Sequence, residues 1–269
     1  MSSEDCWITP KDASAALESG NGKGVKVAIL DSGIEADHPA LSEAKIVQQL
    51  LVEDSELGPD IVPDKNGDVF GHGTAIAHII HEIAPEAEIG SYKVLQARDG
   101  QVAGKAALLG AAVDHAISEG FNVINCSFGT PARSVIFKYF KNWIDEAYLH
   151  DVHVVTACNN ANYARPEWPA YFPSVIAVNM GRIDDDTEFH YRPGRLVEFF
   201  ARGEKVYVPW LDGGWKTVTG SSYAAPRLSG LVARLLSEHP KLSTPLVNAV
   251  LREVADPWSD DIGGDNVWS

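Results

Sequence analysis

Short apolar runs rich in β-branched residues alternate along the chain with segments whose apolar residues recur at helical spacing. The runs predicted as strands are Val25–Leu30, Ile46–Val52, Ile89–Leu95, Val123–Ser127, Val152–Ala157 and Val175–Val178. The intervening segments predicted as helices are Ala75–Ile83, Ala106–Glu119 and Val135–Leu149. Such alternation is typical of βαβ units, in which helices cover both faces of a parallel sheet. The sequence therefore predicts a three-layer α/β fold with a mainly parallel central sheet.

The remainder of the chain fits the same domain. A β-rich stretch, Leu196–Trp215, precedes two predicted helices, Ser222–Glu238 and Thr244–Val254. With 269 residues, of which 45% are hydrophobic, the chain is long enough to bury one large core, and no linker or internal repeat divides it. We expect a single domain over residues 1–269, with an N-terminal extension at 1–24 and a loose, acidic, Gly-rich tail at 259–269.

The overall charge is strongly acidic. The chain has 22 basic and 37 acidic residues, a formal net charge of −15. Phosphate binding needs clustered Lys and Arg, so the composition argues against a nucleic-acid partner. An acidic surface weakly attracts cationic peptides, although solvation alone is the simpler explanation of this charge.

Neither a membrane span nor a secretory signal is recognisable. Residues 1–24 are polar, and the longest apolar runs have the length of a strand. The three cysteines, Cys6, Cys126 and Cys158, match neither a disulfide framework nor a zinc-binding spacing. These features predict a cytoplasmic protein without a membrane partner, or a secreted one if a leader has been removed.

Several polar residues lie where the predicted parallel strands end, the edge at which α/β proteins place their chemistry. Asp31 follows the first strand, and Asn160 follows a later one. His72 and Ser222 each open a predicted helix. In a relay of these residue types, the His takes the Ser proton while the Asp fixes the imidazole tautomer. Taken singly, each residue has a simpler interpretation, as a turn cap, a core histidine or a helix N-cap.

Three motifs resemble those of the subtilisin family. Ala28-Ile29-Leu30-Asp31-Ser32-Gly33-Ile34 resembles its aspartate motif, Gly71-His72-Gly73-Thr74 its histidine motif, and Gly220-Ser221-Ser222-Tyr223-Ala224-Ala225-Pro226 its serine motif. They occur in the family's order, Asp then His then Ser. The similarity extends from about Val25 to Leu236. The resemblance implies a subtilisin-like fold and a serine endopeptidase that works through an acyl-enzyme.

The resemblance also implies a role for each site residue. Ser222 would be the nucleophile, His72 the general base and then acid, and Asp31 the orienting carboxylate. Asn160 would supply the side-chain hydrogen-bond donor of the oxyanion hole. The segment Ser127-Phe128-Gly129 matches the family segment that pairs with the substrate backbone as an added strand.

The chain departs from the family pattern at several positions. Asn159 stands where the family usually has Gly, so we expect a positive φ, which Asn tolerates better than most residues. Ala40 stands where a calcium-ligating Asp is usual, and Ala75–Pro85 lacks the looped insertion of the strong calcium site. His78 and His81 have no acidic or Cys partner at metal-ligand spacing. We therefore expect no catalytic metal, no required cofactor and no strong calcium site, while weaker calcium binding stays open.

An acidic residue is expected at the primary specificity pocket. Counting from Asn160 to Trp168-Pro169 places Glu167 at the base of this pocket, where an anion favours Lys or Arg at P1. The alternative is that Glu167 pairs with Arg165 or faces solvent.

Three further residues are expected at the cleft. Asp68 would add a preference for a basic P2 residue, and Phe70 and Phe128 would line the cleft with apolar surface or serve only in packing.

Two other functions remain open at this stage. Members of the family often carry an inhibitory propeptide, and we expect no room for one in this sequence. The domain would then fold unaided, or be kept in check by low intrinsic activity, a narrow cleft or a separate regulatory partner, and a precursor peptide is a further possible partner. One alternative is therefore a maturation protease or transpeptidase acting on a single precursor. The other is a binding module without turnover, which the intact Asp31, His72, Asn160 and Ser222 argue against.

Overall fold

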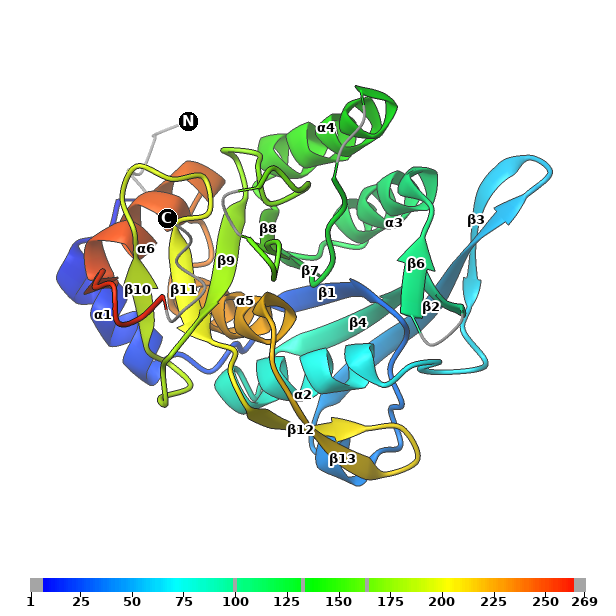
Figure 1. Ribbon diagram of the computed structural model, residues 1–269, viewed down its shortest axis with the longest axis horizontal. Coiled ribbons are helices and arrows are strands. Elements are labelled where there is room, and N and C mark those ends of the chain that lie inside the picture. The colour runs from blue at the N-terminus through cyan, green and yellow to red at the C-terminus, as the bar shows by residue number, and fades with distance from the viewer. Residues whose placement is uncertain (1–6, 99–100, 132–133, 163–164, 264–269) are drawn as a thin grey trace.

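The computed structural model describes residues 7–98, 101–131, 134–162 and 165–263. Its central sheet has the strand order β14-β10-β11-β9-β8-β7-β1-β4-β2-β3 within these residues (Figure 1). The strands are β1 (Lys26–Asp31), β2 (Lys45–Ser55), β3 (Gly58–Pro63), β4 (Glu88–Lys93), β7 (Val123–Cys126), β8 (His153–Ala157), β9 (Ile176–Gly181), β10 (Phe189–Tyr191), β11 (Phe199–Arg202) and β14 (Asp256–Pro257). Of the pairs between neighbours, β2 with β3 and β10 with β11 are antiparallel, and the others are parallel. The predicted α/β class with a mainly parallel sheet is confirmed.

The central strands β1, β7, β8 and β9 are mainly apolar because helices cover both faces of the sheet there, whereas most residues of β2 and β3, near one edge, are half-buried or exposed. In β1, Val27 and Ile29 belong to one hydrophobic core, whereas Ala28 and Leu30 belong to the other. This alternation is what a period of two residues produces in a strand buried on both sides. Every run predicted above as a strand overlaps a strand of this sheet, although Ile89–Leu95 was too long: β4 ends at Lys93, and Leu95 begins the separate β5–β6 hairpin.

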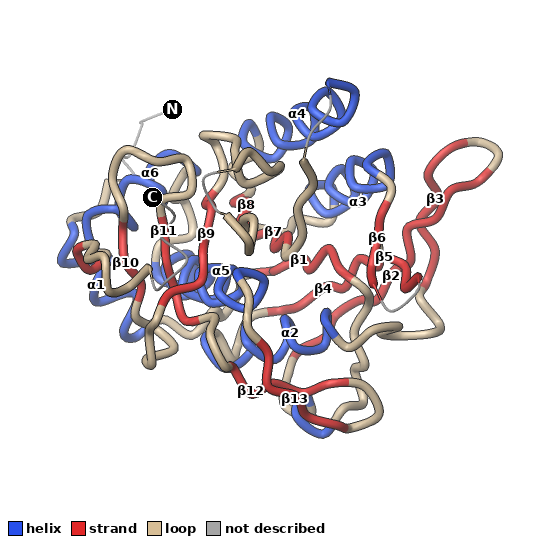
Figure 2. Tube along the Cα trace, viewed as in Figure 1, coloured by secondary structure: helices blue, strands red, loops and turns tan. Residues whose placement is uncertain are grey.

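Helices form the two outer layers (Figures 1 and 2). They are α1 (Pro10–Ser19), α2 (His72–Ile83), α3 (Ala106–Ser118), α4 (Ser134–Leu149), α5 (Ser221–Glu238) and α6 (Thr244–Val254), together with a short 3₁₀ helix, η1 (Pro39–Leu41). Buried residues of α3 and α4 belong to one core, and those of α1, α2, α5 and α6 belong to the other. Two hairpins complete the described chain, β5 (Leu95–Arg98) with β6 (Gln101–Gly104), and β12 (Val206–Trp210) with β13 (Gly214–Val218).

The segments near both ends make contacts with this framework. Helix α1 begins at a capping box formed by Thr9 and Asp12, and it buries Ala13 and Ala16 against the core that contains α5 and α6. The N-terminal extension expected over residues 1–24 therefore includes a packed helix. At the other end, the carbonyl of Ile262 accepts a hydrogen bond from the Arg182 amide at 2.9 Å. The rest of the expected loose tail, 264–269, lies outside the described residues.

None of the helices in the described ranges combines the length and the apolar character that crossing a bilayer requires.

Candidate functional site

The carboxyl ends of the central strands and the beginnings of two helices meet on one side of the molecule. Asp31 is the last residue of β1, and His72 is the first residue of α2. Ser127 follows β7, and Ser222 is the second residue of α5. Side-chain hydrogen bonds join Asp31 to His72 and Ser127 to Ser222, and the ring of Tyr223, next to Ser222, contacts His72, so residues far apart in the sequence form one site.

The imidazole of His72 is held by a buried carboxylate. Its Nδ1 atom lies 2.8 Å from Oδ1 and 2.9 Å from Oδ2 of Asp31. Asp31 is only 1% exposed, and its Oδ1 also accepts the Ser32 amide at 2.7 Å. Donation from Nδ1–H to Asp31 leaves the Nε2 lone pair of His72 available to accept a proton.

The electrostatic surroundings of His72 favour its protonated form. Burial would lower the pKa of His72, but the charge of Asp31, the hydrogen bond to it and the charge of Asp68 together raise this pKa above its ordinary value. Once His72 has taken a proton, the same groups stabilise the imidazolium.

Asp68 lies beneath the start of α2, where it accepts a set of hydrogen bonds from its own neighbourhood. The donors to Oδ1 are Ser32 Oγ, Phe70 N and Gly71 N, and the donors to Oδ2 are Thr74 N and Thr74 Oγ1, all at 2.7–2.9 Å. With a residue exposure of 9%, Asp68 is an internal anchor for the turn before His72. Contact of Asp68 with a basic P2 side chain stays a prediction, since the hydrogen bonds of this carboxylate are all made within the protein.

Ser222 lies at the N-terminal end of α5 and is hydrogen-bonded to the segment after β7. Its Oγ donates to the carbonyl of Ser127 at 2.9 Å, and Ser127 Oγ donates to the carbonyl of Ser222 at 3.0 Å. Within the described residues, no hydrogen bond joins Ser222 to His72. Catalytic hydrogen bonds are often absent or long in proteins without substrate.

The side chain of Asn160 is oriented by the same end of α5. Its Oδ1 accepts the Ser221 amide at 2.7 Å, which assigns Nδ2 to the opposite side of the side chain. No described residue accepts a hydrogen bond from this Nδ2, and Asn160 is exposed. Ser221 Oγ donates to the carbonyl of Cys158 at 2.7 Å, which ties the start of α5 to the end of β8. Of the first three amides of α5, Ser221 N donates to Asn160 and Tyr223 N donates to the Gly220 carbonyl, whereas Ser222 N has no hydrogen-bond acceptor among the described residues. The amide of Asn160 and the backbone N–H of Ser222 can therefore donate to a developing oxyanion.

Asn159 does not adopt the positive φ expected of it. Among the described non-Gly residues, positive φ occurs only at Asp151, Lys205 and Asp212. The side chain of Asn159 instead accepts the amides of Ala161 and Asn162, at 3.0 and 2.8 Å. This local turn, rather than a left-handed backbone, replaces the family glycine.

Glu167 lies against the segment that was expected to pair with substrate. Thr130 and Trp168 form an antiparallel bridge, with both N–H···O distances 3.0 Å. A Cβ added to Gly129 would come within 2.7 Å of Glu167 Cγ, so the Glu167 side chain occupies the space left by this glycine.

The carboxyl of Glu167 is half-buried. Burial raises its pKa, and a hydrogen bond from Asn159 partly offsets that effect. The described contacts include no ion pair between Glu167 and Arg165. The structure therefore brings Glu167 next to Gly129 and Asn159.

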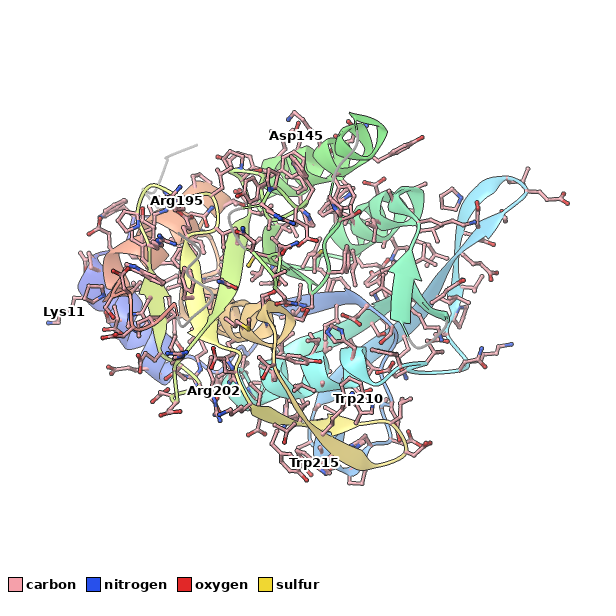
Figure 3. The ribbon with its side chains drawn as sticks, viewed as in Figure 1. Lys11, Asp145, Arg195, Arg202, Trp210 and Trp215 are labelled. Atoms are coloured by element: carbon pink, nitrogen blue, oxygen red, sulfur yellow. The ribbon has the colours of Figure 1, made fainter. Side chains whose placement is uncertain are left out.

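Aromatic residues border His72. Trp210, at the end of β12, packs on Gly71 so closely that a Cβ there would lie 2.7 Å from the indole ring. Phe70 meets Trp210 edge to face, with ring centroids 5.7 Å apart, and Tyr223 meets His72 in the same manner at 5.5 Å. Figure 3 shows Trp210 near the N-terminal end of α2. On the other side, Phe128 is half-buried and packs against the second core.

Some residues of the site were not singled out from the sequence. Ser32 joins Asp68 to the Gly73 amide, and Ser221 joins Asn160 to Cys158. Both lie inside the recognised motifs, so their polar side chains were the available signal. Trp210 lies outside every motif, and nothing local in the sequence marks it.

The cysteines near the site are packed inside the protein. Cys126 and Cys158 are free and buried, and burial raises the pKa of both thiols. Their position at the ends of the neighbouring strands β7 and β8 agrees with the interpretation as small apolar core residues.

The chain is similar in sequence and in structure to known serine peptidases. The profile of the subtilase family, Peptidase S8, matches residues 22–266. Subtilisin DY of Bacillus licheniformis is 28% identical over 252 residues, covering 89% of this chain and 86% of that protein. Thermitase of Thermoactinomyces vulgaris is 27% identical over 254 residues, covering 91% of this chain and 85% of that protein. Among solved structures, the S41 psychrophilic protease superposes with a TM-score of 0.67 at 25% identity, covering 89% of this chain and 87% of that one.

Proposed function

Because the chain belongs to the subtilase family of serine peptidases, we propose that it hydrolyses internal peptide bonds through Asp31, His72 and Ser222, with Asn160 in the oxyanion hole. The observation that carries this proposal is the buried hydrogen bond from His72 to Asp31 at 2.8 Å, beside the start of α5, where Ser222 is half-buried and the next residue, Tyr223, contacts the His72 ring. A hydroxyl is a weak nucleophile without such a base.

The reaction begins with rotation of the Ser222 side chain from the Ser127 carbonyl toward His72 Nε2. His72 takes the hydroxyl proton as Ser222 Oγ attacks the scissile carbonyl. Asn160 Nδ2 and the backbone N–H of Ser222 stabilise the oxyanion. The protonated His72 then gives its proton to the departing amine, leaving an acyl-enzyme. Water attacks this ester by the same route, with His72 again serving as base and then acid.

The preference at P1 is proposed to be for Lys or Arg. Glu167 supports this, because its half-buried carboxyl lies beside Gly129 in the segment that pairs with substrate in this family. A cationic side chain entering this space would favour the charged form of Glu167 and make a charge-assisted hydrogen bond with it. Phe128 would contribute apolar surface for the side-chain stem.

The test is cleavage of a fluorogenic peptide set varied at P1, with Ser222→Ala as the control protein. We expect turnover strongest after Arg and Lys, and loss of about 10⁶-fold in the Ser222→Ala variant. A fluorophosphonate probe should label the parent protein and not this variant. Failure to label the parent protein under conditions that label a known serine peptidase would contradict the proposed chemistry.

Specificity is tested separately with Glu167→Gln. This substitution keeps the size of the side chain and removes the charge. We expect the ratio of kcat/KM for Arg over Leu substrates to fall at least about 10-fold, the effect of losing one charge-assisted contact. An unchanged ratio, or a parent protein that prefers Phe or Leu, would refute the role of Glu167 and leave the triad unaffected.

A dedicated substrate is the alternative that the same experiments address. Negligible casein turnover together with cleavage of one precursor peptide at one site would indicate a maturation protease. Capture of an added amine by the acyl-enzyme, in competition with water, would indicate a transpeptidase. We place such an enzyme in a reducing compartment, on the support of the free thiols of Cys126 and Cys158.

A further inference from the structure

A histidine and two carboxylates converge at the sheet edge formed by β10 and β14. The residues are Glu188, His190 and Asp256, and one ligand atom from each lies within 4.8 Å of the other two. His190 and Asp256 are direct register partners in the parallel pairing of these strands. Glu188 precedes β10 and lies two residues before His190, so both side chains project from the same face of the strand.

The orientation of His190 is set by a backbone carbonyl. Its Nδ1 lies 2.9 Å from the carbonyl oxygen of Pro257, which can only accept, so Nδ1 carries the proton. Its Nε2 lies 2.7 Å from Glu188 Oε1, which in the ionised form also only accepts. The His190 side chain is 9% exposed, so water cannot separate these groups freely. A neutral imidazole would then direct a lone pair at a carboxylate, an arrangement that needs a cation between them or a second proton.

We propose that Glu188, His190 and Asp256 bind a divalent transition-metal ion, and that zinc is the ion this donor set fits best. One imidazole nitrogen and two carboxylate oxygens are ligands suited to zinc, whereas calcium prefers oxygen ligands alone. An imidazole that donates its other N–H to a backbone carbonyl is the arrangement commonly found around metal-bound histidines. The two carboxylates balance the charge of the ion, and water completes its coordination.

The two carboxylates lie at the solvent-exposed side of the proposed site and can shift to coordinate an ion. Asp256 is exposed and Glu188 is 38% exposed at its side chain, so an ion can enter from solvent. His190, the buried member, already has a fixed ring orientation. Metal–ligand distances of about 2.0–2.2 Å in a tetrahedral arrangement would require the Glu188 carboxylate, now 2.7 Å from His190 Nε2, to move around the ion, which its exposure permits.

The bound ion would join β14 to the rest of the sheet. This strand consists of Asp256 and Pro257 only, and it pairs with β10 through His190 and Tyr191. In the strand order, β14 and β10 lie at one edge, with β11, β9, β8 and β7 between them and β1, which carries Asp31 (Figure 1). The ion would therefore stabilise the segment after α6 and take no part in peptide-bond cleavage.

The test uses the full chain with Ser222→Ala, a substitution that prevents self-digestion, after removal of metal with EDTA and dialysis. Calorimetric titration with Zn²⁺ should give a high-affinity site of one ion per chain. Zn²⁺ should raise the thermal midpoint and slow amide exchange at Asp256, because a ligand of the folded state stabilises it. Co²⁺ should give visible absorption characteristic of mixed nitrogen and oxygen ligands.

Two site variants and one matched control decide the assignment. His190→Asn and Asp256→Asn should each weaken Zn²⁺ binding at least about 100-fold, since even changes to partners of metal ligands cost 10–100-fold. Because Asp256 is exposed, its variant is expected to fold even if the His190 variant does not. His150→Asn is the control: His150 also has a carboxylate neighbour, Glu146 at 3.7 Å, but both side chains are 55% exposed.

Three outcomes would overturn the proposal. One is unchanged zinc affinity in both site variants, and another is an equal effect of the His150→Asn substitution. The third is absence of zinc binding in the parent protein, which would mean that a second proton on His190 satisfies the cluster. None of these results bears on Ser222 labelling, so the zinc site and the proposed peptidase activity can fail independently.

Discussion

Ser222 and Ser127 form a reciprocal pair, in which each side-chain hydroxyl donates to the other residue's carbonyl, at 2.9 and 3.0 Å. The pair fixes the start of α5 against the segment that follows β7. It also directs the Ser222 hydroxyl to the Ser127 carbonyl instead of to His72. Rotation of the Ser222 side chain would therefore bring the hydroxyl into position to give its proton to His72. Asn125 supports the arrangement by donating to Ser127 Oγ at 2.9 Å.

Asn160→Ala should lower kcat about 10²–10³-fold and change KM little, because the lost donor acts on charge that develops only in the transition state. Asn160→Asp is the informative partner variant. It keeps the oxygen that accepts the Ser221 amide at 2.7 Å but lacks the Nδ2 donor. Steady-state kinetics on one peptide should show a large loss of kcat for both. Near-normal kcat in the Asp variant would mean that Asn160 serves only to anchor α5.

Asp68→Asn should move the acid limb of the kcat/KM profile to lower pH. Activity requires neutral His72 and is lost as pH falls through its pKa, which Asp68 helps to raise above the ordinary value. Removing that charge lowers this pKa. The substitution should also cost about 1–3 kcal/mol of stability, since it disturbs a buried hydrogen-bonded carboxylate. Asp145→Asn is the control, because Asp145 is an exposed residue of α4 paired with Lys141 (Figure 3). If the acid limb of the kcat/KM profile stays at the same pH, Asp68 fixes the backbone before α2 and does not raise the pKa of His72.

Burial of His153 should make the free energy of unfolding decrease at mildly acidic pH, because the unfolded chain takes up a proton at this residue more readily than the folded protein does. Burial lowers the pKa of His153 to about 4, more than the charge of Asp151 raises it. The unfolded chain takes up a proton near the ordinary pKa of about 6.5, so the contribution is lost progressively as pH falls from there toward the folded value. Urea unfolding of the Ser222→Ala protein should show a loss on the order of 2 kcal/mol from this group between about pH 7 and pH 5. His153→Phe should remove that part of the pH dependence, whereas substitution of exposed His150 should leave it intact.

Two helical glycines should respond in opposite directions to substitution by alanine. In α3, a Cβ at Gly110 would meet nothing closer than Trp143 Cδ1 at 4.0 Å, so Gly110→Ala should stabilise by about 0.5–1 kcal/mol. In α5, a Cβ at Gly230 would lie 2.6 Å from Ile83 Cβ, so Gly230→Ala should destabilise by about 1–3 kcal/mol. Thermal or urea unfolding measures both. A similar change in the free energy of unfolding for both variants would mean that Ile83 of α2 can move away from Gly230 of α5 at no cost in stability.

Local features of the sequence were sufficient to predict the layers of the fold. The apolar pattern of strands such as β1 reflects burial on both faces, a property of each strand by itself. The motifs around Asp31, His72 and Ser222 likewise lie at strand and helix ends, and the structure brings their segments together. Glu167 was placed from its distance to the neighbouring motif, and it does lie beside Gly129.

Other details depended on partners that no local pattern reveals. Donors from Ser32 and Thr74 hold the Asp68 carboxylate in the turn before α2, a role that the sequence did not indicate, and its contact with a basic P2 residue stays a prediction. Asn159 was expected to need a positive φ, but its side chain accepts two amides and supports the turn with an ordinary backbone.

What the sequence by itself determined is therefore the class of fold, the alternation of its central strands and helices along the chain, and the chemical groups available at the carboxyl ends of those strands. Only the tertiary structure decided which groups meet: Trp210 with Gly71, Ser222 with Ser127, and His190 with Asp256. Periodicity and capping act over a few residues and can be read locally. Contacts between distant segments depend on strand order and register, which are chosen by the packing of the whole core.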